Sequence, residues 1–189
     1  MIYQKSIKNE VSAIGVGLHS GNKVRIVLKP AKDDSGIIFK RTDMKGSTEI
    51  KVTPQAVKET RLSSTIGKDK FKISTVEHLM SALSALGVDN ILIEVDGPEI
   101  PIMDGSSISF IYLINSAVLL DQSKLKRFAV IKDVIKVEED EKFAKFEPYR
   151  GFLVDFTIDF PHPAFKEENS RVEIDFFKDS YVNNISRAR

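Results

Sequence analysis

The sequence has 189 residues, of which 42% are hydrophobic and 29% charged, and this composition is typical of a globular protein with one large domain or two small ones. The formal net charge of +1, with lysines and glutamates interspersed, gives no case for nucleic-acid binding, and the lack of cysteine excludes a disulfide framework or a thiolate metal site. No apolar run approaches the roughly 20 residues of a membrane span, and the first residues match neither a signal peptide nor a transit peptide, so we expect a cytoplasmic protein.

The first half of the chain predicts strands followed by a helix, a strand and a second helix. The assignments rest on period-two alternation for strands, on a 3.6-residue apolar period for helices, and on glycine or proline at the turns. The predicted elements are strands at 23–30, 37–41 and 90–95, a hairpin at 61–74 with residues 67–70 at its tip, and helices at 75–86 and 107–120.

The second half returns to strand patterns after the apolar signal lapses near residues 121–127. We therefore expect a first α+β domain at residues 1–122 and a second at 123–189. Two runs of strands, the first followed by helices, predict an α+β fold of two tandem sheet-plus-helix layers. The second layer has barely begun a helix at residue 189, so we expect the chain to be an N-terminal fragment.

The stretch "ISTVEHLMSALSALG", residues 73–87, places an acid beside a histidine at the start of the first predicted helix. Ser74 followed by Glu77 matches the capping box, in which an N-cap serine and a glutamate three residues later satisfy the free backbone groups of a helix start. Under this interpretation Glu77 has only a structural role.

His78 lies nearly opposite the apolar stripe of this helix when side chains are placed about 100° apart. It is therefore either a solvated surface histidine or a metal ligand, and not a core residue. Glu77 and His78 diverge too far to bind one metal together, but they suit hydrolysis with His78 on the metal and Glu77 beside the metal's water. The two residues alone do not decide between these interpretations.

Five stretches read in order strengthen the metal interpretation: "GVGLHSG", "STVEHLMSAL", "VDNILIEVDGPEIPIMDGSS", "VDFTIDFPHPAF" and "ISRAR". Together they resemble the UDP-3-O-acyl-N-acetylglucosamine deacetylase family, the zinc amidases of lipid A biosynthesis, from near Met1 to Arg189. The resemblance implies two α+β domains, each a sheet layered with two helices and carrying a small insert. It places the first insert at about residues 62–72.

The resemblance also implies roles for individual residues. His78 matches a catalytic zinc ligand and Glu77 the general base, while zinc rather than iron rests on the resemblance alone. Leu62 and Ser63 match residues near the metal, although a surface loop explains them as well. His19 belongs to a turn near the active site and does not match a ligand.

Two further matches concern the nucleotide end of the substrate. Phe160 matches an aromatic residue suited to stacking on uracil, and Lys142 matches a lysine near the diphosphate. Each has an ordinary alternative, since Phe160 could belong to a core and Lys142 could be a solvated lysine. His162, between two prolines, is expected to be structural.

The family's other two zinc ligands, its general-acid histidine and an oxyanion-stabilising threonine match no residue of this chain. A three-histidine site from His19, His78 and His162 is an alternative. We expect a full-length parent, acting as a monomer, to hydrolyse the N-acetyl amide of UDP-3-O-acyl-N-acetylglucosamine and release acetate. We expect these 189 residues to be inactive alone. The competing hypothesis is a non-catalytic module that binds a nucleotide or a partner.

Overall fold

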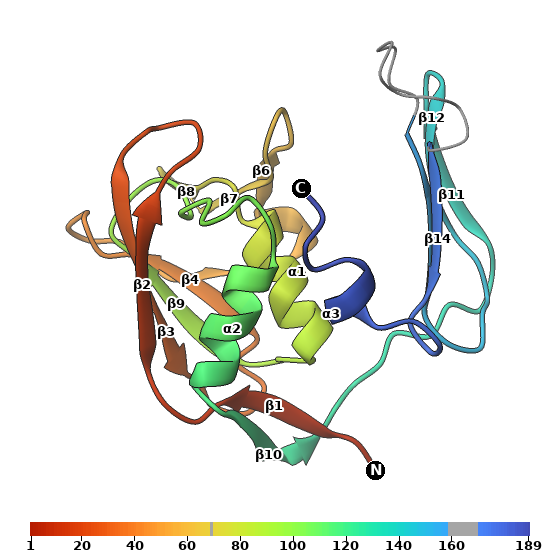
Figure 1. Cartoon of the computed structure of the whole chain (residues 1–189), viewed down its shortest axis with the longest axis horizontal. Coiled ribbons are helices and arrows are strands. Elements are labelled where there is room, and N and C mark those ends of the chain that lie inside the picture. The colour runs from red at the N-terminus through yellow and green to blue at the C-terminus, as the bar shows by residue number, and fades with distance from the viewer. Residues whose placement is uncertain (69, 159–169) are drawn as a thin grey trace. The chain divides into compact units, whose positions relative to one another are not determined.

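The computed structural model describes residues 1–68, 70–158 and 170–189 (Figure 1). The chain divides into two compact units, residues 1–127 with 185–189, and residues 128–184. The described residues form several sheets and three α-helices, so the α+β fold class that the sequence predicts is confirmed. The domain boundary expected after residue 122 and the insert expected at 62–72 stay predictions.

The first unit contains a mixed five-stranded sheet. Its neighbouring strands run antiparallel, except that β4 (Ile37–Arg41) and β9 (Ile91–Val95) run parallel to each other. Every second residue of β3 is buried, at Val24, Ile26 and Leu28, as period-two alternation predicts. The strand order is β2 (Val11–Val16), β3 (Lys23–Pro30), β9 (Ile91–Val95), β4 (Ile37–Arg41) and β5 (Ile50–Lys51).

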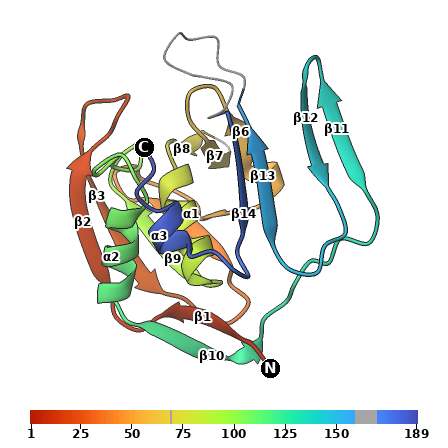
Figure 2. The same cartoon turned by 45° about the vertical axis from the view of Figure 1, so that its right-hand side comes forward.

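Helices α1 (Glu77–Leu86) and α2 (Ile108–Ser116) pack side by side in this unit (Figures 1 and 2). Helix α1 ends at Gly87, whose φ of 69° suits the left-handed conformation of a helix C-terminus. Helix α2 is shorter than the sequence predicted, because Val118 has a φ of 62° and the chain continues as a strand. The buried faces comprise Leu79, Ala82 and Leu83 of α1 and Ile108, Phe110, Ile111 and Ile114 of α2.

Smaller sheets complete the first unit. A three-stranded sheet joins β6 (Val57–Glu59), β7 (Thr65–Lys68) and β8 (Phe71–Ile73), preceded by a 3₁₀ turn at Pro54–Ala56. The predicted hairpin is confirmed, because β7 and β8 pair antiparallel with Lys68 opposite Phe71. Strand β1 (Tyr3–Ile7) pairs antiparallel with β10 (Leu119–Leu125).

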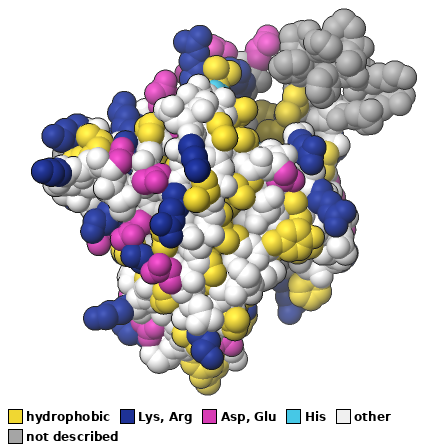
Figure 3. All heavy atoms as spheres, turned by 60° about the vertical axis from the view of Figure 1, so that its left-hand side comes forward, with side chains coloured by type: hydrophobic (Ala, Val, Ile, Leu, Met, Phe, Trp, Pro, Cys, Tyr) yellow, Lys and Arg dark blue, Asp and Glu magenta, His cyan; other side chains and the backbone are white. Residues whose placement is uncertain are grey.

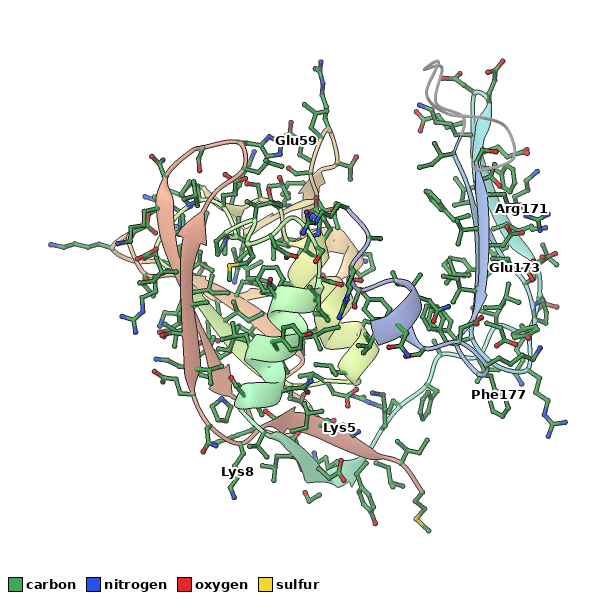
Figure 4. The ribbon with its side chains drawn as sticks, viewed as in Figure 1. Lys5, Lys8, Glu59, Arg171, Glu173 and Phe177 are labelled. Atoms are coloured by element: carbon green, nitrogen blue, oxygen red, sulfur yellow. The ribbon has the colours of Figure 1, made fainter. Side chains whose placement is uncertain are left out.

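The described residues of the second unit form two antiparallel strand pairs and a short helix. The pairs are β11 (Ile135–Glu139) with β12 (Lys142–Phe146) and β13 (Leu153–Thr157) with β14 (Arg171–Asp175), and the helix is α3 (Tyr181–Asn184). Arg171 and Glu173 lie close together along β14 (Figure 4), with 3.4 Å between Nη2 and Oε2. Arg171 also donates two hydrogen bonds to the Asp155 carboxylate on β13, which fixes the polar face of this pair.

Basic and acidic side chains are interspersed on the face of the molecule shown in Figure 3. This distribution agrees with the near-zero net charge of the sequence. Among the residues that the structure describes, no helix has both the length and the apolar character needed to cross a membrane.

Candidate active site

Helix α1 does not begin with the capping box that its sequence suggests. The N-cap position is Val76, and no side chain caps the helix there. Ser74 instead pairs with the segment Pro98–Ile100: its N–H donates to the Pro98 carbonyl at 2.9 Å, and its carbonyl accepts from the Ile100 N–H at 3.0 Å. The capping-box interpretation is therefore wrong, because a neighbouring extended segment takes the backbone of Ser74 out of the helix.

Glu77 holds the loop that precedes β7. Its carboxylate Oε2 accepts a hydrogen bond from the Ser64 N–H at 3.0 Å, and the Val76 N–H donates to the Ser64 carbonyl at 3.3 Å. Two hydrogen bonds, one from the Ser64 N–H and one to the Ser64 carbonyl, thus hold this residue against the start of α1. The Glu77 side chain remains partly exposed, so one carboxylate serves a structural contact and is still accessible to solvent.

The two residues before Ser64 are those that the resemblance places near a metal. Leu62 has a φ of 63° and its side chain is 84% exposed, whereas Ser63 is half-buried. A leucine with positive φ is uncommon and signals a constrained loop. The structure therefore brings Leu62 and Ser63 next to the start of α1 through the Ser64–Glu77 hydrogen bond.

His78 lies in the first turn of α1 and is half-buried. The next residue, Leu79, is completely buried, as are Ala82 and Leu83. His78 and Glu77 are thus the partly exposed residues at the start of a helix whose other face is fixed in the core. This placement agrees with the expectation that His78 is not a core residue.

His19 is an exposed residue of the glycine-rich turn between β2 and β3, and its backbone is held by a buried acid, Glu99. Glu99 accepts hydrogen bonds from the His19 N–H at 3.0 Å, the Ser20 N–H at 2.9 Å and the Thr75 hydroxyl at 3.0 Å. Burial raises the pKa of Glu99, but these hydrogen bonds outweigh it and hold the pKa below its usual range. His19 is in this way connected to the residues that precede Glu77.

Three non-glycine residues with positive φ lie in the segments that meet at this helix start. They are Leu62, Thr75 with a φ of 56°, and Met103 with a φ of 57°. The segment containing Met103 is joined to the turn by the Ile102 N–H, which donates to the Val16 carbonyl at 2.9 Å. Strained backbone of this kind persists where surrounding contacts determine it, and it is concentrated at functional sites.

The remaining expected site residues are not brought to this cluster by the described contacts. Lys142 is an exposed residue at the beginning of β12 in the second unit. Phe160 and His162 lie outside the described residues. Glu99 was not singled out from the sequence. Its one sequence signal is its place as an acid between Pro98 and Pro101.

Metal binding by these residues alone has little support from the arrangement of side chains. Within residues 1–68, 70–158 and 170–189, no three histidine or acidic side chains are grouped so that they could hold a metal ion. A catalytic zinc site normally has three protein ligands. His78 can therefore contribute one ligand, and it requires others from outside the described part of the chain.

Comparison with known proteins gives one family and many relatives. Residues 4–189 match the model of a family described as LpxC, UDP-3-O-acyl N-acetylglycosamine deacetylase. The chain is 48% identical to the UDP-3-O-acyl-N-acetylglucosamine deacetylase of Thioalkalivibrio sulfidiphilus and 50% identical to that of Neisseria meningitidis, over 100% and 98% of its own length. The protein of that name from Xanthomonas oryzae is 48% identical. The chain spans 62% of the length of each of these relatives.

Proposed function

This chain belongs to the UDP-3-O-acyl N-acetylglycosamine deacetylase family, and we propose that its residues form part of a zinc-dependent hydrolase that removes the acetyl group from UDP-3-O-acyl-N-acetylglucosamine. The reaction cleaves the N-acetyl amide by water, releases acetate and leaves a free amine, as a step of lipid A biosynthesis. The observation that carries the proposal is the Glu77 carboxylate, which is fixed by the Ser64 N–H and is still partly exposed.

One contact of Glu77 supports its proposed role as the general base of amide hydrolysis. An ionised carboxylate has about four acceptor positions on two oxygens, and the hydrogen bond from Ser64 uses one of them. The remaining positions can accept a proton from a water molecule. Because Ser64 restricts the rotation of the side chain, the carboxylate is positioned before the substrate arrives.

His78 is the ligand that this chain would contribute to zinc. Successive residues of a helix diverge by about 100°, so Glu77 and His78 face different directions and can perform different tasks. Zinc in such a site supplies Lewis-acid activation of water at neutral pH. The other protein ligands would come from outside the described residues.

The other expected residues are assigned to the substrate. We infer that Leu62 and Ser63 lie beside the reacting amide, since Ser64 connects their loop to Glu77. His19 would border the same region. Lys142 and Phe160 would contact the diphosphate and the uracil ring, by charge pairing and stacking respectively. A cytoplasmic monomer without nucleic-acid partners completes the proposal.

The test uses the protein encoded by the whole reading frame that contains these residues, freed of metal and reconstituted with zinc. Acetate release from UDP-3-O-acyl-N-acetylglucosamine should require zinc and should fall by about 10² or more in Glu77→Gln and in His78→Ala. Zinc content should fall in His78→Ala only. Lys8→Gln, in an exposed loop after β1 (Figure 4), should behave as wild type.

Two results would contradict the proposal. One is full acetate release by the Glu77→Gln variant, and the other is binding of UDP by the metal-free protein without any hydrolysis after zinc is added. The second result would favour a nucleotide-binding module. The 189 residues alone are expected to release no acetate above a zinc-free blank.

A further inference from the structure

We propose that Glu99 is a positioning residue for the reaction, in that its buried carboxylate holds the turn of His19 and the segment leading into α1 in one fixed arrangement. The inference rests on the proposed function, because it concerns the placement of His19 relative to Glu77 and His78. Glu99 itself is 1% exposed and makes no contact that would make it a base or a ligand.

The carboxylate of Glu99 joins two segments that are far apart in sequence. Oε1 accepts from the His19 N–H and from the Thr75 hydroxyl, and Oε2 accepts from the Ser20 N–H. Two successive backbone N–H groups directed at one anion form a compact anion-binding turn. Thr75 is two residues before Glu77, so a single side chain connects this turn to the catalytic end of α1.

The turn is built to admit the carboxylate at close range. A Cβ atom at Gly17 would lie 2.4 Å from Glu99 Oε2 and 2.3 Å from Ser20 Oγ, which is closer than real Cβ contacts. Only glycine therefore fits at residue 17 while Glu99 remains in place. Glycine at this position and an acid at residue 99 thus depend on each other.

Thr75 shows that the connection holds a conformation the chain would not otherwise adopt. A β-branched residue with a φ of 56° is a true outlier of backbone geometry. Its hydroxyl is held by Glu99, while the adjacent Ser74 is paired on both its N–H and its carbonyl. Without the contact to Glu99, Thr75 would be free to relax, and the start of α1 would lose its fixed relation to the turn.

The negative charge is essential to this arrangement and not only the shape of the side chain. Every group that contacts Glu99 here donates a hydrogen, and they contact both of its oxygens. Glutamine has the same size but offers one oxygen and one NH₂ group. In one orientation its NH₂ would face the Ser20 N–H, and in the other it would face the His19 N–H, whereas the Thr75 hydroxyl can accept from it, so Glu99→Gln should release one of the two backbone N–H groups of the turn.

The experiment measures hydrogen exchange by mass spectrometry on the whole protein, together with zinc content and steady-state kinetics. In Glu99→Gln, peptides covering residues 16–22, which contain the released N–H group, should exchange about tenfold faster. The kcat should fall about tenfold to a hundredfold with zinc content unchanged, since a small displacement near the reacting groups slows the reaction without removing a ligand. Glu94→Gln, the same change at an acid of β9 paired with Lys29, is the matched control and should alter none of these.

A second pair of variants keeps the test decisive if Glu99→Gln does not fold. Thr75→Val removes the hydroxyl and keeps the branched shape, and it should speed the exchange of residues 73–78, whose contact to Glu99 it removes. Thr75→Ser keeps the hydroxyl and should restore slow exchange and kcat. Unchanged exchange in the first variant, or faster exchange with unchanged kcat, would overturn the proposal. If the wild-type protein hydrolyses no substrate, the proposed function fails, while the exchange measurements still decide whether Glu99 joins the two segments.

Discussion

The hydrogen bond between Glu77 and Ser64 allows the structural and the catalytic contributions of Glu77 to be separated. A hydrogen bond from a backbone N–H to a charged group contributes about 1.5–3 kcal/mol. Because both partners are only half-buried, solvent screening reduces this contribution, and we take about 1–2 kcal/mol. In Glu77→Ala the Ser64 amide should therefore exchange with solvent about 5- to 30-fold faster.

Glu77→Gln retains an oxygen that can accept from Ser64, so exchange should remain within about threefold of wild type. The amide cannot act as a base, and acetate release by the whole protein should still fall by about 10²–10⁴. The assay is hydrogen exchange of the peptide containing Ser64, compared with the rate of acetate release. The two variants should therefore differ in hydrogen exchange and not in activity. Both should lose acetate release, and only Glu77→Ala should release the loop that contains Ser64.

Ser74→Ala distinguishes this arrangement from the capping box. A capping serine would contribute about 0.5–2 kcal/mol to the free energy of unfolding. In the structure the Ser74 hydroxyl donates to the Pro98 carbonyl at 3.3 Å in an exposed position, so the loss should be below about 0.5 kcal/mol. A loss above 1 kcal/mol, together with unchanged Ser64 exchange in Glu77→Ala, would refute the reasoning.

Three further predictions concern stability, measured by urea unfolding followed by circular dichroism. Arg41 is buried and donates two hydrogen bonds to Asp43 and one to the Lys72 carbonyl. Arg41→Met should therefore lower the free energy of unfolding by about 2–4 kcal/mol and speed hydrogen exchange in β7 and β8. Unchanged hydrogen exchange in these strands would contradict this prediction. The hydrogen bonds from Arg41 lower the pKa of Asp43. The stabilisation by this pair is therefore present above the ordinary aspartate pKa of 3.8 and is lost as the pH falls through the lower folded value. The difference in free energy of unfolding between wild type and Arg41→Met should accordingly shrink only below pH 3.8. Leu79→Ala, in the fully buried face of α1, should cost about 2–5 kcal/mol, whereas the exposed Ala85→Ser should change stability by less than about 0.5 kcal/mol.

Local patterns predict the elements of this fold where the local preference and the tertiary contacts agree. The strand at residues 23–30 and the hairpin around Gly67 are found where period-two alternation and turn residues place them. The start of α1 is different, because Ser74 and Glu77 match a capping box in sequence. Their partners in the structure, Pro98 and Ser64, lie outside that four-residue window. A short-range pattern cannot reveal such competition between partners.

The site is predictable to a smaller extent. Periodicity places His78 away from the apolar stripe of α1, but the proposed roles of Glu77 and His78 come from resemblance to a family. Glu99 could not be recognised from sequence, because its importance depends on a turn 80 residues earlier in the chain. An acid between two prolines is expected in an exposed loop, and only the fold shows that this one is buried.

The different surroundings of Glu77 and Glu99 explain why the second acid cannot replace the first as a base. Glu99 is 1% exposed and accepts hydrogen bonds on both oxygens from donors of three residues, which lower its pKa. Glu77 is partly exposed and is oriented by one backbone N–H. A buried carboxylate with hydrogen bonds on both oxygens is a fixed anchor, whereas a partly exposed carboxylate with a single hydrogen bond can take a proton from water. Glu99→Gln should therefore reduce kcat without shifting the pH at which the rate rises, because the group that takes the proton is unchanged. A shift of that pH in Glu99→Gln would mean that Glu99 itself titrates in the reaction.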